Sequence, residues 1–270
     1  MAFFFNNRPN YFLFFAAFFL LSSISKASGS EVDDESAFTY YEGTGKGPKS
    51  WWKLNPKWES CGKGKYQSPI NIVEEEVVVL PELGKLQRDY NPAPALIKNR
   101  GHDMTISWKQ DAGKITINGT RYRLIQCHWH TLSEHSFNGT RHVLELHMVH
   151  QSQDNKTAVI GIVYKYGRPD PFLSRLFHHI KSIGKKEKEI GIVNPGDIKF
   201  GNRKYYRYIG SLTVPPCSEG VVWTILKKVR TVSRDQVRVL ANAIHDDWKK
   251  NARPVQPTGG RRIQFYTPHK

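Results

Sequence analysis

Three histidines in the middle of the chain have the side-chain type and the spacing of a metal site. His128 and His130 stand two residues apart, and His147 follows in the next apolar segment. Three imidazoles without a fourth protein ligand are typical of catalytic zinc, whose open position holds a water molecule with a pKa of about 7. A His-x-His pair alone is weak support, because most such pairs are surface or core histidines.

The two segments that carry these histidines alternate apolar and polar residues, a pattern that predicts β-strands. Side chains two residues apart share one face of a strand, so Gln126, His128 and His130 lie on the same face. Glu145 and His147 share a face of the second strand for the same reason.

A turn between the two segments would bring these faces together. The dipeptide Asn138-Gly139 lies between them and suits the turn of a hairpin. If the strands pair, the three imidazoles converge on one point. Gln126 and Glu145 then lie beside their nearest histidines, where each can accept an imidazole N–H and so fix the orientation of a metal ligand.

Several further motifs stand in order along roughly residues 38–266, and together they resemble the α-type carbonic anhydrases, most closely the plant branch. The segments that carry the resemblance are Gln67–Ile72, Asn99–His102, His128–His130, Ser133–His135, Glu145–His150, Ser211–Cys217 and Asn251–Pro254. The resemblance implies reversible hydration of carbon dioxide to bicarbonate and a proton by attack of zinc-bound hydroxide. It also implies a twisted central sheet of about ten strands, with zinc at the floor of a conical cleft.

The resemblance assigns the metal site residue by residue. His128, His130 and His147 hold one Zn²⁺ per chain, while Gln126 and Glu145 orient two of the three imidazoles. The ligand set is then complete.

Two other polar positions match family residues that take part in the reaction. Thr213 matches the threonine that accepts a hydrogen bond from the hydroxide and donates one to a buried glutamate, here Glu134. His102 matches the proton shuttle, which can pass the product proton to buffer because the ordinary pKa of histidine is about 6.5. A surface histidine without a role is the alternative for His102.

The substrate pocket is expected to be hydrophobic, because carbon dioxide is neutral and apolar. Val214 stands where many relatives carry threonine or another polar residue, so a modest change in product binding and turnover is expected. By family position, the pocket is lined by Val149, Val159, Leu212, Thr213, Val214, Val221 and Trp223.

Short strands dominate the rest of the chain, so the fold class predicted is mainly β (α+β), with a large, mostly antiparallel central sheet and a few peripheral helices. Alternating residues on both sides of Asp111–Gly113 predict another hairpin. The apolar run Val159–Tyr164 suits a strand buried on both faces.

Two helices have clear start signals. Asp170-Pro171 supplies a capping residue and a proline for the first turn, and Phe172, Leu176 and Ile180 then form an apolar stripe. Ser233–Gln236 is a capping box that starts the second helix.

Residues 1–27 have the features of a secretory signal peptide. Arg8 precedes the apolar stretch Tyr11–Leu21, and Ser25-Lys26-Ala27 offers a small-x-small cleavage site. Residues 28–270 are then predicted to form one catalytic domain without a membrane span. The expected destination is the extracellular space or apoplast, and the chloroplast stroma, reached through the secretory route, is the alternative.

The charge of the chain is strongly basic. The formal net charge of +16 falls to +14 without the signal peptide, because Arg8 and Lys26 are that segment's only charged side chains. The basic residues are spread out rather than gathered in one tract, which disfavours nucleic-acid binding. A solvated surface is the plain expectation, and weak attraction to anionic wall polysaccharide is a hypothesis that the charge supports.

The chain has three cysteines, and a secreted chain is expected to oxidise one pair. Cys61 and Cys217 occupy positions that are bridged in secreted members of the family that the chain resembles, which implies this pairing. Cys127 faces away from the metal side and is expected to be a buried apolar residue. The acceptors for N-glycosylation, if exposed, are Asn118, Asn138 and Asn155.

Two other functions fit parts of the pattern. A catalytically weak or inactive storage or carbohydrate-binding protein on the same fold is expected to have lost a zinc ligand, whereas all three histidines stand here. A different zinc hydrolase is disfavoured, because the sequence has no His-Glu-x-x-His segment and no general-base carboxylate predicted at the metal.

Overall fold

The structure is a computed structural model that describes residues 1, 37–184, 187–244 and 250–268. Apart from Met1, the predicted signal peptide and the residues up to 36 lie outside the described part. The helices are α1 (Trp51–Leu54), α2 (Ser60–Lys63), α3 (Pro171–Ser182) and α4 (Arg234–Ala243), and short 3-10 turns span Glu42–Thr44, Pro56–Trp58, Pro81–Leu83 and Pro195–Asp197. The strands are β1 (Asn71–Ile72), β2 (Val78–Val79), β3 (Gln87–Tyr90), β4 (Ala93–Asn99), β5 (Met104–Trp108), β6 (Gly113–Ile117), β7 (Thr120–His130), β8 (Ser136–Phe137), β9 (Thr140–Arg141), β10 (Leu144–Gln151), β11 (Thr157–Tyr166), β12 (Lys188–Val193), β13 (Tyr205–Ser211), β14 (Glu219–Leu226), β15 (Arg230–Val232) and β16 (Gln264–Tyr266).

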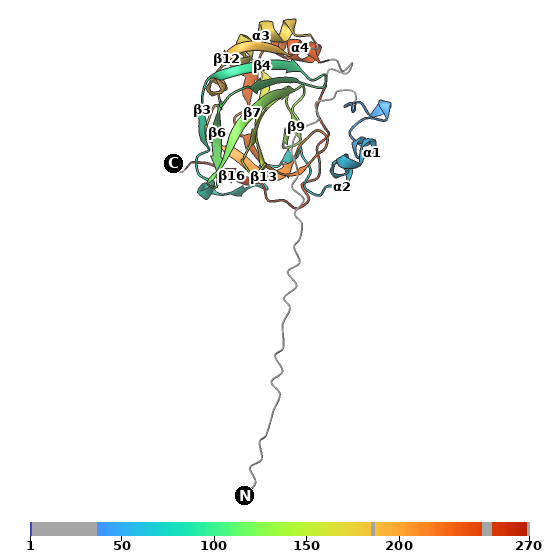
Figure 1. Ribbon diagram of the computed structural model, residues 1–270, viewed down its shortest axis with the longest axis vertical. Helices are drawn as coiled ribbons and strands as arrows, with labels where there is room; N and C mark the ends of the chain where they lie inside the picture. The colour runs from blue at the N-terminus through green and yellow to red at the C-terminus, as the bar shows by residue number, and fades with distance from the viewer. Residues whose placement is uncertain (2–36, 185–186, 245–249, 269–270) are drawn as a thin grey trace.

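A mixed sheet of 13 strands forms the framework of the described residues (Figure 1). Ten of its strands follow one path, in the order β12-β4-β5-β7-β10-β11-β14-β13-β16-β2, and β3, β6 and β15 pair beside this path. Most neighbours are antiparallel, whereas β11–β14, β11–β15 and β16–β2 are parallel. The predicted mainly β fold with a large central sheet is therefore confirmed.

The two histidine-bearing strands, β7 and β10, are antiparallel neighbours in the middle of this sheet. Their register places His147 opposite His128, as the predicted pairing of these strands requires. Asn138-Gly139 does form a turn, and both residues have positive φ. This turn closes the short hairpin β8–β9, which belongs to a separate three-stranded sheet with β1. The connection from β7 to β10 is therefore longer than a simple two-residue hairpin.

The hairpin predicted around Asp111–Gly113 is wrong. β5 and β6 do not pair with each other, and both run antiparallel to successive parts of β7. The turn is instead Asn118-Gly119 between β6 and β7, where Asn118 has a φ of 48°. Alternation shows which residues share a face but not which strand each segment pairs with, and β7, with 11 residues, is long enough to pair with both.

Both longer helices begin where their capping residues predict. The Asp170 carboxylate accepts two backbone N–H groups of the first turn of α3, each at 3.0 Å. Ser233 and Gln236 form the capping box of α4, and Gln236 also donates to the Asp170 carbonyl at 2.8 Å. The two helices pack together at the top of Figure 1. In the described part of the chain, no helix combines the length and the apolar character needed to cross a membrane.

A buried histidine in β10 makes folding sensitive to pH. His150 is fully buried, its Nε2 accepts a hydrogen bond from the Tyr90 hydroxyl at 2.9 Å, and its Nδ1–H donates to the Ala158 carbonyl at 3.3 Å. Burial lowers the pKa of His150 to about 4. Below pH 6.5, the unfolded chain therefore binds a proton that the folded chain does not, and the free energy of unfolding decreases as the pH falls toward 4.

Replacing this histidine with glutamine is expected to flatten that dependence. The difference between the two pKa values corresponds to about 3 kcal/mol across the window from pH 6.5 to pH 4. Denaturant unfolding of the metal-free protein at pH 7, 5.5 and 4 measures it, for the wild type and His150→Gln. The exposed residue His178 in α3 provides the control His178→Gln, which keeps the wild-type slope. Equal slopes for all three proteins would contradict the expectation.

Candidate metal centre

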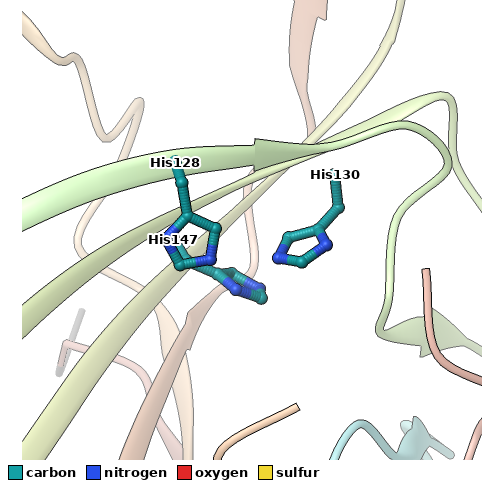
Figure 2. Close-up of side chains that lie close together, drawn as sticks. All are labelled: His128, His130 and His147. Carbon is teal, nitrogen blue, oxygen red and sulfur yellow. The ribbon is translucent and has the colours of Figure 1, made fainter. Parts of the chain in front are cut away.

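Strands β7 and β10 bring three imidazoles together, as Figure 2 shows. One ring nitrogen from each of His128, His130 and His147 lies within 4.8 Å of the other two. The ring centroids of His130 and His147 are 4.5 Å apart, and those of His128 and His147 are 5.2 Å apart. All three side chains are buried. The predicted convergence of the three histidines is therefore confirmed.

Each imidazole donates a hydrogen bond that fixes its orientation. His128 Nδ1–H donates to Gln126 Oε1 at 2.9 Å, and His147 Nε2–H donates to Glu145 Oε1 at 2.9 Å, as expected. His130 Nδ1–H donates to the backbone carbonyl of Asn251 at 2.6 Å. The nitrogens placed to ligate a metal are thus Nε2 of His128 and of His130, and Nδ1 of His147.

The role of Asn251 was missed by sequence reasoning. Its segment belongs to a motif that supports the resemblance, but nothing in the motif indicates that a backbone carbonyl holds a histidine 121 residues away. Only the pairing of distant segments reveals this contact.

The protonation of His128 and His147 and the unpaired nitrogen of His130 both suit a metal. Burial lowers the pKa of His128 and of His147, so both are neutral at neutral pH, and metal ligation requires neutral imidazole. His130 Nε2 is buried and has no hydrogen-bond partner among the described residues. A buried polar atom without a partner costs free energy, which ligation of a metal would recover. Three converging imidazole nitrogens, one of them a buried atom without a hydrogen-bond partner among the described residues, fit zinc.

A hydrogen-bonded chain extends from His147 into the protein. Glu145 Oε1 also accepts His135 Nδ1–H at 2.7 Å, and His135 Nε2 accepts the Tyr208 hydroxyl at 2.7 Å. The Tyr208 oxygen in turn lies 2.9 Å from Ser68 Oγ. Burial raises the pKa of Glu145, but the neighbouring His135 and His147 outweigh burial and hold this pKa well below its usual range. Glu145 is therefore a fixed carboxylate behind the ligand.

Replacing Glu145 with glutamine is expected to weaken zinc binding by about 10–100-fold, because the neutral amide no longer supports the His147 ring as a carboxylate does. Competition with a chelator of known affinity measures the change. Glu189→Gln is the control, since Glu189 forms an exposed ion pair with Lys109 away from the histidines. Unchanged zinc affinity in Glu145→Gln would show that the carboxylate does not tune the ligand.

The predicted hydrogen bond between Thr213 and Glu134 is not formed in the described structure. Glu134 Oε1 instead accepts the backbone N–H of Arg253 at 2.8 Å. Glu134 Oε2 lies 3.6 Å from His130 Nε2 and 4.0 Å from His147 Nδ1. Both Thr213 and Glu134 are buried, and the relay between them stays a prediction.

The predicted shuttle residue is not at the surface. His102 occupies the turn between β4 and β5 and is only 4% exposed. Its ring centroid lies 5.0 Å from that of Phe38. Phe38 belongs to a buried apolar group, called the amino-terminal cluster below, whose contact with His102 the sequence did not predict. Its buried members are Phe38, Trp51, Trp58, Cys61, Val214 and Cys217.

Most of the predicted pocket residues gather beside the metal centre. The ring of Trp223 lies 4.8 Å from the ring of His147, which places this group next to a predicted ligand. Val214 packs instead in the amino-terminal cluster. The five predicted residues that share one buried apolar cluster are Val149, Val159, Leu212, Val221 and Trp223.

The predicted disulfide is present. Cys61 and Cys217 are bonded, with their Cα atoms 4.9 Å apart, and the bond ties the Thr213 loop to the amino-terminal segment. Cys127 is free and fully buried, as expected. The glycosylation acceptors predicted from the sequence are all exposed on turns with positive φ, at Asn118, Asn138 and Asn155.

Comparisons with known proteins agree with this geometry. Residues 46–267 match the eukaryotic-type carbonic anhydrase family. The chain is 51% identical over 265 residues to alpha carbonic anhydrase 4 of Arabidopsis thaliana, covering 97% of this chain and 98% of that protein. The crystal structure of dioscorin complexed with ascorbate has a TM-score of 0.84 and 43% identity, covering 86% of this chain and 99% of that one. The alpha-carbonic anhydrase of Thermovibrio ammonificans, in complex with sulfanilamide, has a TM-score of 0.79 and 31% identity, covering 87% and 100%.

Proposed function

Because the chain belongs to the eukaryotic-type carbonic anhydrase family, we propose that it is a zinc-dependent enzyme that interconverts carbon dioxide with bicarbonate and a proton. One observation carries the proposal: three buried imidazoles converge, and a separate acceptor holds each ring. A binding protein that did not use a metal would have no need for three buried, oriented imidazole nitrogens at one point.

The residues that would hold zinc are His128, His130 and His147. Zinc bound there supplies a nucleophilic water at neutral pH, because it lowers that water's pKa to about 7. Gln126, Glu145 and the Asn251 carbonyl keep the three rings in place, so that little reorganisation is needed when the metal arrives.

The neighbouring side chains suit a small apolar substrate. The cluster that includes Trp223 and Val149 offers a neutral molecule a hydrophobic surface next to His147. We assign Thr213 and Glu134 to orienting the nucleophile, since both are buried, Glu134 Oε2 lies 3.6 Å from His130 Nε2, and Leu212 beside Thr213 belongs to the apolar cluster next to His147. His102 accepts the product proton, as histidine can do near neutral pH.

Stopped-flow hydration of carbon dioxide, with zinc measured in the same sample, tests the function. The mature protein is expected to hold about one zinc per chain and to show hydration that acetazolamide inhibits. Bound zinc without hydration would contradict the enzyme, and failure to bind zinc after reconstitution would contradict the metal site itself.

A storage or small-molecule-binding role on the same fold is the second candidate. Its support is the likeness to dioscorin, whose structure was solved with ascorbate. The retained triad favours the enzyme, and the hydration assay separates the two. Titration with ascorbate or neutral sugars would detect the second role if hydration were absent.

We further propose that the protein enters the secretory route and reaches the extracellular space or apoplast, with the chloroplast stroma as the alternative. The signal-like residues 1–27 and the disulfide support this, because such bonds persist in oxidising compartments. A fluorescent protein fused to the carboxyl end would report the destination. Weak attraction to anionic polysaccharide follows from the net charge, and binding to polygalacturonate should then disappear at high salt.

A further inference from the structure

The turn that carries His102 is fixed by hydrogen bonds on both sides of the histidine. This segment, residues 99–103, is called the His102 turn below. The backbone N–H of Arg100 donates to the carbonyl of Asp103 at 2.9 Å, and that of Gly101 donates to Asn99 Oδ1 at 2.8 Å. Gly101 has a φ of +84°, which glycine adopts without the penalty of a side chain. The backbone at His102 is therefore held in one conformation.

A buried ion pair closes the same turn. Asp103 is 0% exposed, and its carboxylate accepts both Arg100 Nε at 2.8 Å and a second nitrogen of that guanidinium. Thr105 Oγ1 also donates to it at 2.8 Å. Burial raises the pKa of Asp103, but the Arg100 guanidinium beside it helps to hold that pKa well below its usual range. Buried ion pairs add little net stability, so stability alone does not account for this one.

The carboxylate of Asp103 also faces the imidazole of His102. Asp103 Oδ2 lies 3.6 Å from His102 Nε2. A buried carboxylate beside an imidazole attracts the N–H of the ring nitrogen that faces it, and so favours a proton on that nitrogen. Asp103 therefore favours the form of His102 with hydrogen on Nε2.

Asn251 ties the His102 turn to the metal centre. Its side-chain Nδ2 donates to the His102 carbonyl at 2.8 Å and to the Trp129 carbonyl at 3.0 Å. Its own carbonyl accepts the His130 Nδ1–H. One buried residue thus contacts both a predicted zinc ligand and the turn that carries the proton acceptor, so it sets their separation.

We propose that Asp103, held by Arg100, is a positioning residue that fixes the imidazole of His102 for proton transfer, while Asn251 fixes its separation from the metal ligands. The proposal rests on the proposed function. Each hydration releases one proton, which His102 accepts at a ring nitrogen and then gives to buffer, so His102 itself is unchanged after a turnover. Asp103 exchanges no proton in this sequence.

The first test compares Asp103→Asn with the wild type. Maximal turnover in dilute buffer is expected to fall roughly tenfold, because proton transfer then limits the rate. The value of kcat/KM for carbon dioxide stays the same, because proton transfer comes after hydration, and added imidazole restores turnover. Asp170→Asn is the matched control, since Asp170 is also a buried aspartate, and its carboxylate accepts backbone N–H groups of α3. It is expected to leave both kinetic constants unchanged.

A second readout does not depend on catalysis. Nitrogen NMR of the His102 imidazole at constant pH, in the zinc-free and zinc-loaded protein, is expected to show the Nε2–H form in the wild type and a mixture in Asp103→Asn. If the two proteins differ in this way but the wild type hydrates no carbon dioxide, the proposed function is overturned and the positioning of His102 by Asp103 still stands. Unchanged tautomer and turnover in Asp103→Asn would overturn the positioning role.

A third variant separates positioning from general support of the site. Arg100→Lys keeps the positive charge but loses the bidentate contact with Asp103. It is expected to reduce turnover in dilute buffer by a smaller factor than Asp103→Asn does. If Asp103→Asn does not fold, Arg100→Lys provides the test of the ion pair in its place. Loss of zinc, or an equal fall in kcat and kcat/KM, in either variant would show that the ion pair supports the metal centre instead and would overturn the proposal.

Discussion

Replacing His147 with alanine removes zinc from the protein and abolishes measurable hydration of carbon dioxide, while the chain stays folded. Structural zinc sites have apparent binding free energies of about 10–16 kcal/mol. Loss of one of three protein ligands then costs about 4 kcal/mol, or roughly 10³-fold in zinc affinity. Folding is expected to survive, because Glu145 keeps its hydrogen bonds to the ring and the backbone N–H of His135.

Zinc content, carbon dioxide hydration and circular dichroism on the same preparation measure these effects. The control is His178→Ala, which removes an exposed histidine from α3 and should change none of the three. If His147→Ala retained one zinc per chain with wild-type affinity, the metal would lie elsewhere. If it lost activity but kept zinc, His147 would act in the reaction in some way other than ligation.

Removing the disulfide, as Cys61→Ser with Cys217→Ser, lowers the free energy of unfolding by about 5 kcal/mol in the chain-entropy description. The effect is large because the bonded residues are 156 positions apart, so the bond restricts a long loop of the unfolded chain. It also holds the loop that carries Thr213 against the amino-terminal cluster.

Denaturant unfolding of the oxidised wild type and the double variant measures this difference. Cys127→Ala is the control, because it removes a buried cysteine without breaking a bond, and its cost is expected to be much smaller. If both proteins were destabilised equally, packing around the cysteines rather than the cross-link would account for the effect.

Local patterns predicted the parts of the fold that depend on neighbouring residues. Alternation identified β7 and β10, and the face that carries His128 and His130 followed directly from it. Asp170 and Ser233 predicted the starts of both longer helices, because a cap bonds to backbone groups only two or three residues away. The order of several motifs indicated the family, which periodicity alone could not do.

Contacts between distant segments could not be predicted from local sequence patterns. The sequence does not show that the Asn251 carbonyl holds His130, because every residue has a carbonyl and only the fold decides where it points. The burial of His102 beneath Phe38 depends on how the amino-terminal segment lies across the domain. Arg100 and Asp103 are close in sequence, yet only their burial distinguishes them from an ordinary surface pair.

Hydrogen bonds in and around the metal centre join segments of the chain that are made at different times. His130 and Asn251 are 121 residues apart, and the Arg253 guanidinium reaches the Cys61 carbonyl across 192 residues. The ribosome delivers the amino-terminal part first, so a nascent chain carries all three histidines before it carries the group that orients one of them. A premature stop codon just before Asn251 would leave every ligand encoded and still yield a protein with an incomplete site. The metal centre is thus a property of the finished polypeptide rather than of the short segment that contains its ligands.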